Sequence, residues 1–177
     1  MRAVRRLPGV ERLEQTTTNA PSTTVDPACP TVTRTTNHFA TLIVVTTAPD
    51  ATPEQAAAVP TTMAGQLAWT GVSLELTVPA GAGHVASTVE YDGTFDQHIP
   101  DATALEIAQG LATLAATPHV DGLHAVIPTT MRVDFGSLTI GLDATDDATT
   151  TSVRSVIAGT AFADTTLHGS FGNGAKP

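Results

Sequence analysis

The tripeptide Asp-Ala-Thr recurs along the chain, and its setting constrains the fold more than any other feature. It occurs at residues 50–52, 101–103, 143–145 and 147–149. The first three copies each follow or close a strand-like stretch, and each precedes a helix-like one. Threonine is suited to cap a helix there, because its hydroxyl accepts a hydrogen bond from a free backbone N–H of the first turn. The repeat therefore predicts three strand–helix–strand units.

The three units are predicted at about residues 38–79, 84–127 and 131–171. The first opens with residues 39–47, an almost continuous apolar run of the kind found in strands that are covered on both faces. Thr52 follows, with proline at the next position and glutamine three residues later, which is the pattern of a capping box. This unit therefore carries the strongest helix-start signal in the chain.

The other elements are predicted from shorter patterns. Thr103 and Glu106 repeat the capping box in the second unit, and Thr145 is expected to cap the third helix. Pro60 is expected to break or kink the first helix, because proline lacks an N–H and its ring clashes with a preceding carbonyl. Residues 131–135 are predicted to form a strand that ends in a bend, and residues 162–171 a last strand.

Two further patterns predict which side chains are buried. Ile107, Leu111 and Leu114 fall at i, i+4 and i+7, which predicts one apolar stripe along the second helix. His124 alternates with Leu123 and Ala125, which predicts an exposed position on its strand.

Together the units predict an α+β fold in which a mainly antiparallel sheet carries three helices on one face. The arrangement would be of ferredoxin-like type, extended by the third unit. Residues 118–126, PHVDGLHAV, resemble the passage from helix to strand in ferredoxin-like domains. That resemblance implies a type of fold and no activity. The folded domain is predicted to span residues 37–171, and residues 172–177 to be a frayed end.

Residues 1–36 are predicted to be a disordered tail or spacer. From residue 15 to residue 36 the chain is rich in Thr, Pro, Ser and Asn and has almost no large apolar side chain. Such a stretch buries too little surface to offset the entropy lost on ordering. It contains Cys29, the single cysteine, which excludes an internal disulfide or a Cys-based zinc site and is interpreted as a spare thiol.

The charge balance argues against nucleic acid as a partner. Seventeen acids face eight bases, and from residue 13 onward sixteen acids face four bases. Such a field repels phosphate backbones and anionic membranes. No apolar run approaches the length of a transmembrane helix, and residues 1–15 have a basic start without the apolar core of a signal peptide.

Composition nevertheless favours an extracellular or cell-envelope location in a G+C-rich bacterium. The chain has 32 threonines, 27 alanines and a single lysine. A start upstream of Met1 would reconcile this location with the missing signal peptide.

The richest polar segment is the predicted loop at residues 84–101. Its weak candidates for metal ligands are His84, Asp96, His98 and Asp101. Asp96 and His98 stand one residue apart, and a carboxylate and an imidazole at that spacing can chelate a divalent metal. The sequence has no nucleophile elbow, Walker A loop, H-E-x-x-H or G-x-G-x-x-G pattern. We therefore predict no catalytic residue and no cofactor, and commit to no metal site.

Three functional hypotheses follow. The leading one is a non-catalytic, acidic α+β domain that is secreted or associated with the cell envelope. The first alternative is a metal-dependent enzyme or metal-binding protein that uses the loop at 84–101. The second is a structural or assembly protein whose copies pair through an exposed edge strand, because an open sheet edge offers unpaired backbone groups.

Overall fold

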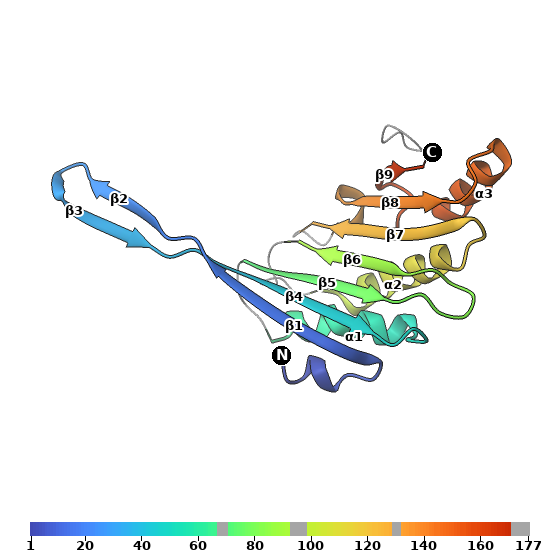
Figure 1. Cartoon of the computed structure of the whole chain (residues 1–177), viewed down its shortest axis with the longest axis horizontal. Helices are drawn as coiled ribbons and strands as arrows, with labels where there is room; N and C mark the ends of the chain where they lie inside the picture. Colours follow the sequence, from blue (N-terminus) through green and yellow to red (C-terminus); the bar gives the residue numbers. More distant parts are fainter. Residues whose placement is uncertain (67–70, 93–98, 129–131, 171–177) are drawn as a thin grey trace.

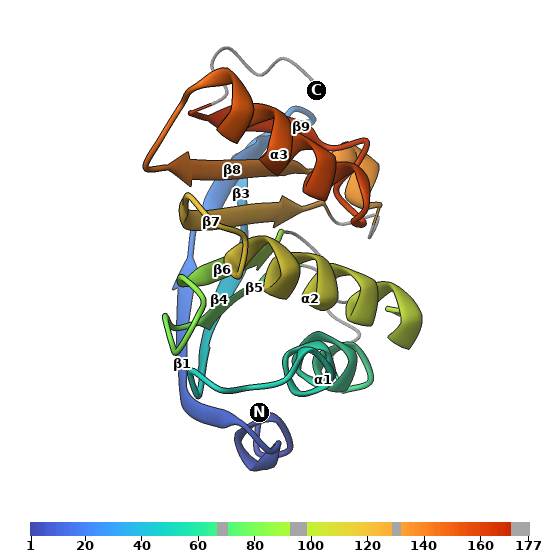
Figure 2. The same cartoon turned by 90° about the vertical axis from the view of Figure 1, so that its right-hand side faces the viewer.

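The computed structural model describes residues 1–66, 71–92, 99–128 and 132–170. Within them the chain forms a mixed seven-stranded sheet, with three α-helices packed on one face (Figures 1 and 2). A separate two-stranded arm projects from the body (Figure 1). The predicted α+β class is confirmed.

The sheet is ordered β1-β4-β5-β6-β7-β8-β9. Its strands are β1 Val10–Asn19, β4 Phe39–Thr47, β5 Val72–Val78, β6 Ser87–Tyr91, β7 Val120–Ile127, β8 Ser137–Leu142 and β9 Thr166–Gly169. The helices are α1 Pro53–Ala64, α2 Asp101–Ala115 and α3 Asp147–Ala158, with 3-10 turns η1 Val4–Arg6 and η2 Val133–Phe135. The arm consists of β2 Ser22–Asp26 and β3 Cys29–Thr36.

Each helix connects two parallel strands that are hydrogen-bonded neighbours: α1 joins β4 to β5, α2 joins β6 to β7, and α3 joins β8 to β9. The other pairs, β1–β4, β5–β6 and β7–β8, are antiparallel. The sheet is therefore mixed, and the prediction of a mainly antiparallel sheet is wrong. The ferredoxin-like arrangement is not confirmed either. Its split units place a strand between the two strands that a helix joins, whereas here those two strands pair directly.

The core lies between the sheet and the helices. Alternate residues of each central strand face the helices, as the two-residue period of a strand requires. The predicted stripe of α2, Ile107, Leu111 and Leu114, is buried against them. The largest fully buried side chains include Ile43, Leu74, Ile127, Ile140 and Phe162.

The N-terminal segment is not the disordered tail that its composition predicts. Residues 10–19 form β1, which pairs along its length with β4, and Leu13 lies opposite Val45 in the core. Val4, in η1, is fully buried. The composition argument failed because it weighs apolar burial alone. Threonine and valine favour extended backbone, and an edge strand satisfies its backbone groups by pairing even when most of its side chains are exposed.

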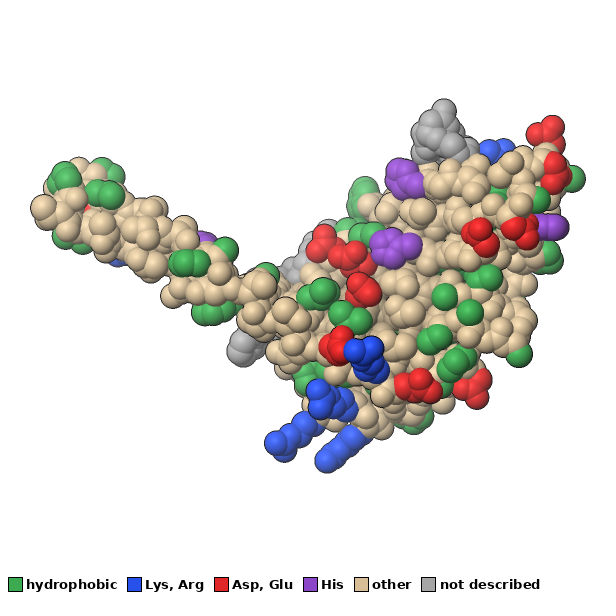
Figure 3. All heavy atoms as spheres, in the orientation of Figure 1, with side chains coloured by type: hydrophobic (Ala, Val, Ile, Leu, Met, Phe, Trp, Pro, Cys, Tyr) green, Lys and Arg blue, Asp and Glu red, His purple; other side chains and the backbone are tan. Residues whose placement is uncertain are grey.

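The arm continues the β1–β4 ribbon beyond the body. Ala20 donates its backbone N–H to the His38 carbonyl at 2.8 Å, and the Asn19 amide donates to the Asn37 side-chain oxygen at 2.9 Å. Beyond this junction β2 and β3 pair only with each other, and all their residues are exposed. Figure 3 shows the arm standing clear of the body.

The helix starts only partly follow the Asp-Ala-Thr repeat. At α1 the capping box is present: the Thr52 hydroxyl accepts from the Gln55 N–H, and the Gln55 side chain accepts from the Thr52 N–H. At α2 the helix already begins at Asp101, so Thr103 lies inside it and the predicted box is wrong. Pro100 is the residue before this start, three residues ahead of the threonine, and its backbone is extended.

The third helix is capped by Asp146 and not by the predicted Thr145. Its carboxylate accepts the backbone N–H groups of Ala148 and Thr149, and the Thr149 hydroxyl as well. A carboxylate is the better acceptor at the positive end of the helix dipole. These bonds, the Thr149 N–H first among them, hold the pKa of Asp146 below its ordinary value.

Two further expectations differ from the structure. Helix α1 does not break at Pro60 but continues to Ala64, so the expected break is wrong, while the alternative of a kink stays a prediction. The proline removes one backbone hydrogen bond, and the following Thr61 hydroxyl donates to the Ala57 carbonyl at 3.2 Å, which satisfies an acceptor next to the gap. The predicted strand at 131–135 is instead the 3-10 turn η2 where the chain is described, and residue 131 lies outside the described residues.

Removing the Asp146 cap should weaken the protein in a pH-dependent way. Because its pKa is lowered by folding, Asp146 stabilises the fold above its ordinary pKa, and this contribution is lost as the pH falls through the lowered value. We expect Asp146→Ala to lower the melting temperature at pH 7 and to flatten the acid side of the stability profile. Asp147→Ala, next in sequence but not the cap, is the matched control. Equal losses from both variants would refute the capping role.

Candidate functional site

The predicted ligand residues do not gather at one place among the described residues. His84 lies in the turn before β6, beside the last turn of α2, where Val85 donates its N–H to the Ala115 carbonyl at 3.0 Å. Asp101 is the first residue of the same helix. A helix of 15 residues is about 22 Å long, so His84 and Asp101 lie at opposite ends of it. Asp96 and His98 lie outside the described residues.

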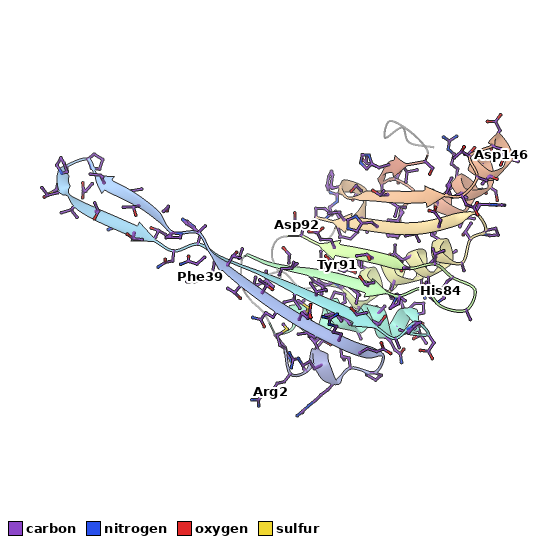
Figure 4. All side chains as sticks on the ribbon, in the orientation of Figure 1. Arg2, Phe39, His84, Tyr91, Asp92 and Asp146 are labelled. Atoms are coloured by element: carbon purple, nitrogen blue, oxygen red, sulfur yellow. The ribbon has the colours of Figure 1, made fainter. Side chains whose placement is uncertain are left out.

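Figure 4 shows the same separation along the strands: His84 precedes β6, and Asp92 follows it at the far end. The described residues contain no group of three His, Cys, Asp or Glu that could hold a metal ion. The hypothesis of a metal site in the loop therefore depends on residues 93–98.

His84 has a structural task of its own. Its Nε2 lies 2.8 Å from the Pro49 carbonyl and its Nδ1 lies 3.0 Å from the Val85 carbonyl. Both ring nitrogens therefore face backbone acceptors. Gly81 and His84 also pair through their backbones, with the Gly81 N–H donating to the His84 carbonyl at 3.1 Å. The bond from His84 to Pro49 connects the turn of residues 79–86 to the loop before α1. The bond from the Val85 N–H to the Ala115 carbonyl connects the same turn to α2.

Beneath this fastened turn lies a pocket of about 220 Å³. Its walls come from β5, β6, the start of α1 and the last three turns of α2. Eight of the eighteen residues that line it are alanine or glycine, so the elements meet here without filling the space between them. Larger apolar walls are supplied by Leu76, Val89, Ile107 and Leu111.

Among the described residues that line the pocket there is no Asp, Glu, Lys or Arg, and the polar side chains are those of Thr52, His84, Ser87 and Tyr91. Both ring nitrogens of His84 are already bonded to the backbone carbonyls of Pro49 and Val85. Ser87 and Tyr91 are buried. Burial raises the pKa of the Tyr91 phenol far above its ordinary value, so this group stays neutral. Sequence patterns gave no signal for the pocket, because it arises where small side chains from separate elements face one another.

On the opposite face of the sheet, no helix lies among the residues that the structure describes, and the centre of this face is acidic (Figures 2 and 3). Glu75 on β5 lies directly opposite Glu90 on β6, and like charges in that position repel. His124 on β7, predicted to be exposed, lies beside them with its Nε2 4.0 Å from a Glu90 carboxylate oxygen. All three side chains are partly exposed to solvent.

The arm has two different faces. Because Thr23 pairs with Thr35 and Val25 with Thr33, these four side chains share one face, which we call the uncharged face. Ser22, Thr24, Arg34 and Thr36 share the other face, which carries a cation. On the uncharged face the hydroxyl oxygens of Thr23 and Thr35 lie 3.4 Å apart. All four of these β-branched side chains are exposed to solvent.

Comparisons with protein-family models, with curated proteins and with solved structures found no match to this chain. In the parts of the chain that the structure describes, no helix is long and apolar enough to cross a membrane.

Proposed function

We propose that this chain is a non-catalytic assembly module that pairs with a second copy of itself through the β2–β3 arm. The observation that carries the proposal is the arm itself: two strands that pair with each other, leave the body and bury no residue. An isolated two-stranded hairpin is marginally stable in water. A partner that packs against it would supply the missing stabilisation.

The distribution of charge favours the arm over the body as the contact. Residues 20–38 contain one acid, Asp26, and one base, Arg34, so the net charge of −9 resides in the rest of the chain. Two bodies therefore repel each other, most directly if their acidic open faces meet. Two arms can meet without net electrostatic repulsion, because neither arm carries a net charge. Arms that project from the bodies can join while the acidic surfaces stay apart.

The chemistry of the uncharged face favours a second copy as the partner. A threonine hydroxyl both donates and accepts, so a strip of threonines is complementary to an identical strip. Cross-strand threonine pairs are also favourable in sheets. In a two-fold dimer the same strip serves both partners, which is the commonest symmetry of soluble oligomers.

The sequence suggested an assembly protein whose copies pair through an exposed edge strand of the sheet, and this proposal assigns the pairing to the arm instead. Strand β9, at the edge of the sheet next to β8, has only four residues, Thr166–Gly169, and offers a shorter edge than the arm. A secreted or envelope location stays a prediction. The metal-dependent alternative also stays a hypothesis. Its candidate ligands Asp96 and His98 lie outside the described residues.

A charge placed on either face of the arm tests the proposal. We expect the chain to be a reversible dimer in sedimentation equilibrium at micromolar to hundred-micromolar concentration. Thr35→Lys places two like charges against each other on the uncharged face, and we expect it to weaken the dimer at least tenfold. Thr36→Lys, the next residue, adds the same charge to the other face and should change the dissociation constant less than threefold.

Circular dichroism of both variants checks that the body stays folded. A chain that is monomeric throughout this concentration range would overturn the proposal. So would a dimer that Thr35→Lys and Thr36→Lys weaken equally, because the uncharged face would then have no special part in it.

A further inference from the structure

The pocket beneath the turn of residues 79–86 restricts its ligands first by their charge and then by their size. A ligand carboxylate, phosphate or ammonium would lose its hydration on entry and find no carboxylate, Lys or Arg among the described lining residues, while both ring nitrogens of His84 are already bonded to backbone carbonyls. Burying an unpaired ion costs far more free energy than an apolar contact returns. Charged metabolites are therefore excluded, and the walls favour apolar surface.

Volume limits the ligand further. An apolar cavity of about 150 Å³ holds a single benzene ring. A pocket of about 220 Å³ has room for one ring with a short substituent, or for a short branched aliphatic chain. The buried Ser87 in its lining gives such a molecule a polar neighbour, so one neutral hydroxyl or carbonyl is also accommodated.

From these features we infer that the pocket is a binding site for a small, neutral, mainly apolar molecule, with a single aromatic ring as its best-fitting core. The inference does not depend on the arm, because no arm residue lines the pocket. The site is formed in advance of binding. His84 holds the turn to Pro49 and Val85 holds it to Ala115, so a ligand does not have to order the entrance.

The test titrates the full chain with toluene and, separately, with benzoate, while methyl resonances are followed by NMR. Toluene should give saturable shifts confined to methyl groups around the pocket, such as those of Val89, Ile107 and Leu111. Benzoate has the same ring with a carboxylate in place of the methyl group, and should give none of these shifts at equal concentration. Saturation by benzoate, or no saturation by toluene up to its solubility, would overturn the inference.

Two alanines of α2 supply matched variants. Ala108 lines the pocket, and Ala108→Leu should fill it and weaken toluene binding at least tenfold. Ala102 is exposed on the same helix and does not line it, so Ala102→Leu should leave the affinity within twofold of the original. Ala112→Leu, nearer the entrance, replaces Ala108→Leu if that variant fails to fold. Equal affinities in the filled and control variants would place the toluene elsewhere and refute the assignment.

Discussion

Val4→Asp is expected to destabilise the protein by about 4 kcal/mol or more, the range reached when an unpaired charge is buried. Val4 is completely buried at the start of the chain, although composition predicts that region to be a disordered tail. Its 3-10 turn packs against β1 and α1, and the Arg5 side chain donates to the Leu13 carbonyl at 3.4 Å. The loss is measured as the change in the free energy of unfolding in urea.

The matched control is Val32→Asp, the same substitution in the arm. Val32 is 51% exposed, so its replacement should change the stability of the body by less than about 0.5 kcal/mol. The pair thus divides the predicted tail into a folded part, residues 1–19, and a part that the body does not need, residues 20–38. If Val4→Asp were as well tolerated as Val32→Asp, the packing of the N-terminal segment described here would be wrong.

Phe162→Ala should have the second large effect, a loss of about 3–5 kcal/mol, because it leaves a cavity where the largest fully buried side chain of the described residues lies. Phe162 follows α3 and lies over Gly110 of α2. A Cβ built on Gly110 would come within 3.1 Å of the Phe162 ring. The phenylalanine therefore joins the last helix to the central one, and a side chain at position 110 would crowd the ring.

A double-mutant cycle tests this pairing. Gly110→Ala alone should destabilise the protein, because the new methyl group crowds the ring. In the Phe162→Ala background the same change should be neutral or stabilising. The ring is then gone, only the Thr160 Cβ remains close at 3.3 Å, and alanine is more favourable than glycine in a helix interior by about 1 kcal/mol. Additive effects in the cycle would show that the two residues do not share this contact.

The sequence predicted elements best where one local pattern decides the structure. The apolar run at 39–47 became β4, and the Thr52 capping box begins α1 as expected. Spacing along the chain also identified the buried stripe of α2. Each of these depends on residues within a few positions of one another, where helix and strand periods can be read directly.

Features that depend on distant contacts were not predictable in this way. The pairing of β1 with β4 supplies backbone hydrogen bonds to a segment whose side chains give no sign of burial. Phe162 was expected in a strand, and its role is evident only when Gly110 faces it. The candidate site shows the same limit. His84 was singled out as a metal ligand, yet its ring bonds to the carbonyl of Pro49, 35 residues away.

Hydrogen exchange of the arm amides tests the proposed assembly most directly. A hairpin of two strands alone protects its amides poorly, whereas a paired arm protects them. We predict that backbone amides in residues 22–36 exchange more slowly as protein concentration rises through the dimer range, while those of β4–β8 do not change. In Thr35→Lys the concentration dependence should disappear. Arm amides that exchange at one rate at every concentration would contradict pairing between two copies of the chain.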